Sequence, residues 1–393
     1  RFHDKNNVIT ALSALVIIIF FIPYTASGFA ACGKLFNSLF GINYQVAMML
    51  SALLIVGYTI TGGFNAVCVT DLVQSIVMTG ALAIVLIYGI SRAGGWTAVM
   101  DNAAALPGYL SLTSTFDVAS GSEVKYNFLT IFSTAAWGLG YFGMPHILVR
   151  FMAIEDEKKL VLSRRIASVW VVIAMTAGVL IGIVGLGMTK AGALETLTGS
   201  NSETIIVRIA GIISQHNALT ALIAGIILAG ILAATMSTAD SQMLAAASGV
   251  SQNIVHDFLK FKISEKTNLL IARLTIVGIA IVSIFLARNP NSSVFKIVSF
   301  AWAGFGGAFG AVVLCSLFWK RCNLAGAIAG IISGGATVFI WKYLIRPLGG
   351  ILDIYELLPA FIVSLIFIIV VSLLTKAPDE EIVREFEAAG KKA

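Results

Sequence analysis

The chain has 393 residues, of which 58% are hydrophobic and only 12% are charged. Its mean hydropathy is +0.93. A globular protein carries roughly twice that share of charged residues, and one water-soluble core could not bury this much apolar surface. The composition therefore excludes a single water-soluble domain and indicates a chain whose solvent is lipid.

The formal net charge of +6 does not point to nucleic acid, because no basic stripe interleaved with aromatic residues accompanies it. In membrane proteins an excess of Lys and Arg is expected in cytoplasmic loops. The four cysteines form no CxxC pair, and neither they nor the four histidines have the spacing of metal ligands. An intramembrane enzyme would need clustered acids and bases or a nucleophile with its base, and the sequence shows neither.

Ten apolar stretches alternate with polar breaks, and each approaches or exceeds the roughly 20 residues that a membrane helix needs. They cover residues 8–31, 44–62, 67–91, 126–152, 165–189, 218–250, 267–287, 295–318, 324–345 and 354–375. The longer connections, 93–124 and 190–217, should lie on one side of the membrane, and the second contains a candidate amphipathic helix, ETIIVRIAGIIS. The pattern predicts an all-α, multi-pass membrane bundle.

The distribution of basic residues predicts the orientation of this bundle. If the first span begins in the cytoplasm, 17 of the 26 Lys and Arg residues fall inside, together with the C-terminal tail 376–393. That tail reads as a solvated, charged stretch, too short for an enzymatic or sensor domain. The chain opens with Arg1 and RFHDKNN, which is not a signal peptide, and we expect it to be truncated at its N-terminus.

The fourth span contains WGLGYFGMP, in which three glycines and Pro145 crowd into the middle of a membrane helix. Such a stretch favours unwinding near Gly138–Gly143, and in lipid a broken helix is tolerated where it faces a protein-lined cavity. Trp137 and Tyr141 would share a face and offer an apolar wall and a hydroxyl to a small zwitterion. Glycine packing with a proline kink is the alternative, and spacing alone favours it slightly.

In the sixth span Ala234, Ser237, Thr238 and Ser241 recur at i, i+3, i+4 and i+7, so one face is lined with oxygen. Hydroxyls and carbonyls are ligands that an alkali cation accepts. The alternative is that these hydroxyls bond to their own helix or to a neighbour, which spacing alone favours. Asp240 is a carboxylate within a span and therefore a functional-site hypothesis, although its cytoplasm-side position also allows a water-exposed role.

Asp71 and Tyr24 are further candidates with open alternatives. Asp71 lies near the cytoplasmic end of the third span, where it could line an exit path for an ion or could simply favour a helix N-terminus. Tyr24, Ser27 and Gly28 share a face of the first span, and a phenol beside close backbone would suit a substrate wall. Core packing is the better interpretation of that face from spacing alone.

Seven segments resemble the solute:sodium symporter family, in the same order from Arg1 to about Pro378. They are RFHDK, YTASG, VTDLVQS, WGLGYFGMPHILVRFMA, ILAATMSTADSQ, SFAWAGFGGAFGAVVL and FWKRCNLAGAIAG. The WGLGYFGxPH and MSTxxxQ stretches are the specific ones. The resemblance implies a secondary active transporter of a bacterial inner membrane that couples Na⁺ to uptake of a small solute, with L-proline as the expected solute.

The resemblance also implies a LeuT-type fold of two inverted five-helix repeats. Against that pattern about three N-terminal helices are missing, and residues 8–91 form the remainder of repeat one. Repeat two would cover 126–318, two peripheral helices 324–375, and a cytoplasmic tail 376–393. The expected partners are the solute, sodium and the lipid bilayer, with no nucleic acid and no obligatory protein partner.

Site residues follow from the resemblance position by position. Ser237 and Thr238 would be side-chain sodium ligands, beside the carbonyl of Ala234. The implied proline-binding residues are Trp137, Tyr141, Pro145 and Tyr24. The implied or possible ion-pathway residues are Asp71, Asp240 and Ser241, and the last two leave the sodium stoichiometry open.

Two alternatives to proline uptake remain open. A related symporter could carry another solute, such as pantothenate, a sugar or sialic acid. A transporter scaffold can also serve as the input half of a membrane sensor, against which the short tail argues.

Overall fold

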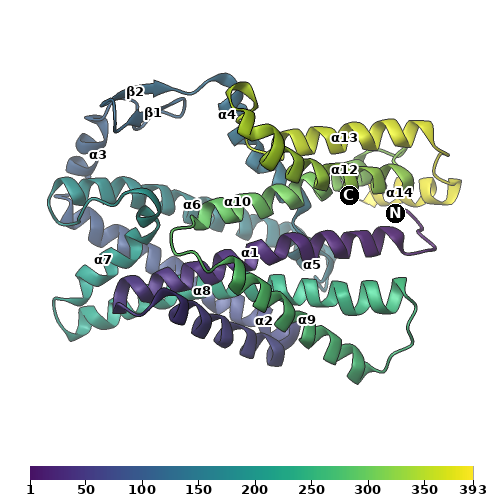
Figure 1. Cartoon of the computed structure of the whole chain (residues 1–393), viewed down its shortest axis with the longest axis horizontal. Coiled ribbons are helices and arrows are strands. Elements are labelled where there is room, and N and C mark those ends of the chain that lie inside the picture. The colour runs from purple at the N-terminus through teal and green to yellow at the C-terminus, as the bar shows by residue number, and fades with distance from the viewer. Residues whose placement is uncertain (393) are drawn as a thin grey trace.

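The computed structural model describes residues 1–392, and its helices form an elongated bundle lying roughly along one axis (Figure 1). The helices are α1 (Val8–Phe40), α2 (Tyr44–Arg92), α3 (Trp96–Ala104), α4 (Phe128–Ala135), α5 (Pro145–Met152), α6 (Leu160–Lys190), α7 (Ile205–Ser214), α8 (Ala218–Ser248), α9 (Glu265–Leu286), α10 (Val294–Phe305), α11 (Ala311–Phe318), α12 (Leu324–Ile340), α13 (Leu357–Leu374) and α14 (Glu380–Lys392). Strands β1 (Ser114–Asp117) and β2 (Ser122–Lys125) form an antiparallel hairpin, a small exception to the expected all-α fold.

Short helical segments of other kinds complete the architecture. Wider π-helical turns extend α8 (Gly249–Phe258), join α10 to α11 (Gly306–Gly310) and extend α12 (Trp341–Ile345). Tighter 3₁₀ turns occupy Ala136–Gly143, Glu157–Lys159, Gly199–Thr204, Arg346–Leu348 and Gly350–Leu352. The amphipathic helix expected in the 190–217 connection is present as α7, and its buried side chains are Val207, Ile209, Ala210 and Ile213.

Eight helices in the described part of the chain are long and apolar enough to cross a membrane, so ten separate long helices are not confirmed. The second and third expected spans are joined in α2, which continues through a non-helical Gly63 (φ 68°, ψ −178°). That positive φ is a conformation that glycine adopts without steric cost. The fourth span is broken, so α4 and α5, with eight residues each, are both too short to count.

The break in the fourth span lies where the sequence predicts it. The chain leaves α4 after Ala135, runs as a 3₁₀ turn from Ala136 to Gly143, passes an extended Met144 (ψ 106°) and enters α5 at Pro145. Proline is tolerated at the first turn of a helix and disfavours α conformation in the residue before it. The prediction of an interruption near Gly138–Gly143 is therefore confirmed.

The two ends of the bundle are distinct. The N-terminus and α14 lie close together at one end, whereas α3, the hairpin and α7 lie at the other (Figure 1). The Arg1 guanidinium donates to the carbonyls of Ser316 and Trp319, at 3.0 and 3.2 Å, and the His3 ring lies 2.9 Å from the Glu385 carboxylate. The two long connections thus lie at one end of the bundle and the N-terminus and α14 at the other, which agrees with the expected arrangement.

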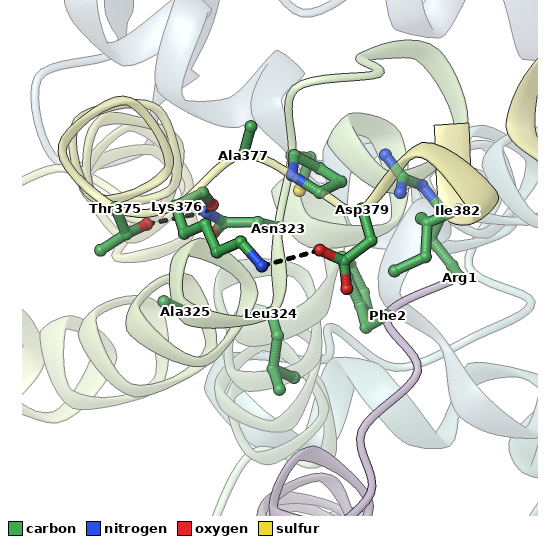
Figure 2. A pocket seen from close by; sticks show the side chains of 12 residues that line it. Arg1, Phe2, Asn323, Leu324, Ala325, Thr375, Lys376, Ala377, Asp379 and Ile382 are labelled. Carbon is green, nitrogen blue, oxygen red and sulfur yellow. Dashed lines mark hydrogen bonds and ion pairs between the residues drawn. The ribbon is translucent and has the colours of Figure 1, made fainter. Parts of the chain in front are cut away.

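The C-terminal tail is more ordered than a solvated stretch. It forms the amphipathic helix α14, whose Ile382 is 7% exposed. A cavity of about 280 Å³ lies between the N-terminal residues, the start of α12 and the α13–α14 connection. Figure 2 shows the side chains that line it. Asn323, at the start of α12, donates to the Thr375 hydroxyl and to the Lys376 carbonyl, both at 2.7 Å, so this side chain holds the start of the tail against the bundle.

Helix α1 occupies the centre of the main core and packs against α2, α8, α9 and α10. Two hydrogen bonds join polar groups of α1 to these neighbours. The buried Thr25 hydroxyl donates to the Gln242 amide oxygen of α8 at 3.1 Å, and the Ser283 hydroxyl of α9 donates to the Ile22 carbonyl at 2.9 Å. A second core joins the end of α2 to α6, α7 and the start of α8.

Glu203, in the connection before α7, joins three elements at the end opposite the termini. Its carboxylate accepts from Lys34 of α1 at 2.7 Å, from the Ser293 hydroxyl at 2.8 Å, and from the backbone N–H groups of Val294 and Phe295 at 3.1 and 3.2 Å. An anion at a helix N-terminus is stabilised by these amides and by the helix dipole. Partial burial acts to raise the pKa of Glu203, but these donors outweigh it and the pKa is lowered.

We expect Glu203→Gln to reduce stability at pH 7 by about 0.3–1 kcal/mol. A carboxylate with a lowered folded-state pKa stabilises the protein above the ordinary glutamate value of about 4.3, and this contribution is lost as the pH falls through the lowered value. The difference between native protein and variant should therefore close in acid. Thermal unfolding of purified protein across pH measures it, with Glu195→Gln as a control because Glu195 is 63% exposed beside Arg208. A difference that does not vary with pH would contradict the assignment.

Candidate functional site

The broken segment between α4 and α5 packs closely against α10. A side chain at Gly140 would overlap the Trp302 indole, and one at Gly143 would overlap the Phe305 carbonyl, so both positions need glycine. The Trp302 indole N–H donates to the carbonyl of Trp137 at 3.0 Å. This bond gives the Trp137 carbonyl a hydrogen-bond partner on α10, outside its own segment.

Trp137 and Tyr141 share a face, as their spacing predicts, and that face meets α10. The Trp137 ring stacks on Trp302 and Phe295, with centroids 5.4 and 5.5 Å apart. The Tyr141 ring meets Trp302 edge-on at 4.8 Å and remains 45% exposed. An aromatic wall with an accessible phenol is therefore present, and its contact with a substrate stays a prediction.

A cavity of about 540 Å³ opens between α1, α2, α5, α8 and α9. Of the candidate residues, Pro145 and Ser241 line it. Tyr24 lies next to the cavity. Its ring centroid is 6.2 Å from that of His146, which lines the cavity. The structure thus brings three candidates from α1, α5 and α8 to one region, whereas Trp137 and Tyr141 face α10.

Ser237 and Thr238 in the oxygen-lined stripe of α8 are half-buried, and their hydroxyls turn towards their own helix. The Ser237 and Thr238 hydroxyls both donate to the Ala234 carbonyl, at 3.3 and 3.1 Å. Back-bonding of this kind is the alternative that the sequence left open. It also gathers three neutral oxygens within one helical turn, and a hydroxyl that donates its hydrogen retains lone pairs for a cation.

A charged cluster lies where α2, α5 and α8 meet. Arg150 of α5 donates to the Asp71 carboxylate of α2 and, at 2.9 Å, to the Ser241 hydroxyl of α8. Asp240 is fully buried and accepts from the Tyr58 hydroxyl at 2.5 Å and from the Ser241 N–H at 2.6 Å. The water-exposed alternative for Asp240 is therefore wrong, because its carboxylate is removed from solvent and satisfied by protein donors.

The helix-terminus alternative for Asp71 is not what the structure shows. Asp71 lies in the continuous part of α2 beyond the Gly63 kink, and the Arg150 side chain, 37% exposed, is its charged partner. The sequence reading missed Arg150 as a site residue and counted it among the inside basic residues. A lone arginine in the apolar stretch HILVRFMA was the available signal, since ionisable residues in a span normally pair with one another.

Tyr58 and His146 were also missed. Tyr58 lies within the apolar second span on α2, and no spacing rule connects it with Asp240 of α8, which is 182 residues away. His146 follows Pro145 directly, and its Nδ1 atom is buried with no hydrogen-bond partner among the described residues. Both residues matter only because separate helices meet around the cavity.

Comparisons with known proteins agree over nearly the whole chain. Residues 1–334 match the model of the Sodium:solute symporter family. The "Osmoregulated proline transporter OpuE" of Bacillus subtilis (strain 168) is 39% identical over 386 residues, which are 98% of this chain and 75% of that protein. The "Sodium/proline symporter" of Staphylococcus aureus is 38% identical over 384 residues, 96% of this chain and 72% of that protein.

The fold has a match among solved structures as well. A Na⁺-coupled sialic acid symporter, solved in a substrate-bound outward-open state, superposes with a TM-score of 0.72 over 97% of this chain and 76% of the other. The sequence identity is 18%, so this likeness concerns the fold. With the family model, the two relatives and the membrane-spanning helices together, the chain belongs to the sodium:solute symporter family.

Proposed function

We propose that this protein carries out sodium-coupled uptake of L-proline by alternating access, as a multi-pass protein of a bacterial inner membrane with its C-terminus in the cytoplasm. The observation that carries the proposal is the 38–39% identity, over 96–98% of the chain, with relatives whose names specify proline. The broken segment beside an aromatic wall supports it, because interrupted helices are where such transporters bind their solutes.

The mechanism needs no covalent chemistry. Sodium and proline act by binding one conformation of the transporter more tightly than the other, and the sodium gradient supplies the direction. On this chain the proposed sodium ligands are the Ser237 and Thr238 hydroxyls and the Ala234 carbonyl, all within one turn of α8. The proposed proline contacts are Trp137, Tyr141, Pro145 and Tyr24.

The architecture we propose is the LeuT-type inverted repeat. Residues 8–91 would belong to repeat one, 126–318 to repeat two, 324–375 to two peripheral helices and 376–393 to the tail. The Gly63 kink supports a division of α2 into two spans, and the break supports a composite fourth span, which together would restore ten crossings. The expectation that further helices precede this part of the fold stays a prediction.

The test of the proposed function is uptake of labelled proline by the full-length protein in proteoliposomes. An inward sodium gradient should drive accumulation, whereas an equal potassium gradient should not. Unlabelled pantothenate, sugars and sialic acid, added in excess, should leave proline uptake unchanged. Competition by one of these solutes, or uptake that is independent of sodium, would overturn the proposal.

We expect Trp137→Ala and Tyr141→Ala to raise the half-saturating proline concentration by about tenfold or more, because each removes a large apolar contact surface. The half-saturating sodium concentration should change much less. Phe142→Ala is the matched control, since Phe142 lies in the same broken segment and is 42% exposed. Equal effects on both constants would indicate that the two aromatic side chains serve packing alone.

We expect Ser237→Ala and Thr238→Ala to shift the sodium activation curve upward by about tenfold to a hundredfold. A lost hydroxyl contact to a charged partner costs roughly 1.5–3 kcal/mol, at about 1.4 kcal/mol per decade. Thr238→Ser should largely preserve the curve because the hydroxyl remains. Sodium-dependent initial rates of uptake measure these shifts.

Two further variants sharpen the sodium experiment. Thr235→Ala is the control, because Thr235 lies on the same helix and its hydroxyl also donates to a backbone carbonyl, that of Ile231 at 3.1 Å. It should leave the sodium curve in place. Asp71→Asn tests the proposed ion pathway of Asp71, Asp240 and Ser241, and should slow transport more than it weakens sodium binding. Unchanged sodium dependence in both Ala variants would assign the stripe to packing.

A further inference from the structure

Tyr355 lies outside both proposed repeats, in the connection between α12 and α13, yet it contacts the broken segment and α10 together. Its backbone N–H donates to the Ser133 hydroxyl of α4 at 2.7 Å. Its phenol donates to the Ser299 carbonyl of α10, also at 2.7 Å. Its ring stacks on the Trp137 indole, with centroids 5.6 Å apart and an interplanar angle of 18°.

The residue that follows Tyr355 anchors this connection to the protein. Glu356 is 1% exposed, and its carboxylate lies 3.0 Å from the Arg346 guanidinium and 3.7 Å from the Lys342 ammonium. Arg346 also pairs with Asp353 at 2.8 Å. A buried carboxylate is costly to separate from its cationic partners, because removing it from both would leave its charge unpaired. The backbone at Tyr355 is therefore held in place independently of α10.

The Trp137 indole depends on its neighbours for its orientation. Trp137 lies in the 3₁₀ segment, where the backbone lacks the regular bonding of an α-helix. Three rings stack around it, and two of them, Phe295 and Trp302, belong to α10. The third is Tyr355, which hydrogen-bonds to Ser133 of α4 and Ser299 of α10 and so supports the indole from outside α10.

We propose that Tyr355 is a positioning residue for the substrate wall, which holds the Trp137 indole in place and thereby raises the affinity for the transported solute. This inference rests on the proposed function of Trp137. Aromatic stacking adds to the apolar burial of the rings, and the phenol–carbonyl bond fixes the rotation of the Tyr355 ring. The peripheral helix pair α12–α13 thus contributes to substrate recognition without touching the substrate.

The experiment compares two variants of Tyr355 in the full-length protein. Tyr355→Phe keeps the ring and removes the bond to Ser299, and it should raise the half-saturating proline concentration by about threefold to tenfold. Tyr355→Leu removes the ring as well and should raise it further. The maximal rate per transporter and the half-saturating sodium concentration should each change by less than about twofold, as expected when only uniform substrate binding is reduced.

Tyr343 supplies the matched control on the same peripheral helix pair. Its ring stacks on Phe339 and is 60% exposed, with no contact to the broken segment among its aromatic neighbours. Tyr343→Phe and Tyr343→Leu should leave the half-saturating proline concentration unchanged. An equal rise in the Tyr343 variants would assign the effect to general loosening of α12 and α13, and would overturn the inference.

A double-mutant cycle tests whether Tyr355 acts through Trp137. In a Trp137→Ala background, Tyr355→Leu should raise the half-saturating proline concentration little further, because the effects of mutations at coupled residues are not additive. Additive effects would overturn the inference, and so would Tyr355 variants that leave the constant unchanged while Trp137→Ala raises it. If Trp137→Ala leaves the half-saturating proline concentration unchanged, the proposed substrate contact of Trp137 is wrong. Failure of the Tyr355 inference and failure of the proposed function of Trp137 are therefore distinguishable.

Discussion

A backbone that leaves α-helical geometry inside a bilayer has to find its hydrogen bonds within the protein. In this molecule the constraint applies to Ala136–Gly143, and the close approach of α10 supplies a hydrogen-bond donor there. The absence of side chains at Gly140 and Gly143 lets the two segments touch, and the Trp302 indole N–H reaches the Trp137 carbonyl. The stacking of Trp137 and Tyr141 on Trp302 belongs to the same packing arrangement.

The charged side chains among these helices also find their partners within the protein. Two carboxylates and one guanidinium lie among α2, α5 and α8, and most of their hydrogen-bonding capacity is met by one another or by hydroxyl and amide groups. Isolated charges would be expensive at this depth, so the three helices are tied together by Asp71, Arg150 and Asp240. Because the cluster borders the cavity that also contains Pro145, any movement of α5 relative to α2 and α8 has to rearrange it.

Elements outside the proposed core are attached through specific polar contacts. Glu203 joins the connection before α7 to α1 and to the start of α10. Tyr355 and Glu356 join the α12–α13 connection to α4, α10 and the end of α12. The first half of α10 therefore receives hydrogen bonds from Glu203 and Tyr355, in addition to its contacts with the broken segment. A change in the position of α10 would break these hydrogen bonds or move the elements that make them.

The sequence by itself determined the membrane class, the approximate spans, the shared sides of the loops and termini, and the position of the break. These are consequences of local composition, since hydropathy, proline and clustered glycine act within a few residues of chain. It also identified Asp240 and the Ser237–Thr238 stripe as unusual. Only the tertiary structure decided that Asp240 bonds Tyr58, that Asp71 pairs with Arg150 and that Trp137 stacks on α10 and Tyr355. These contacts join residues about 80 to more than 200 positions apart, and no local pattern specifies which helices come together to make them.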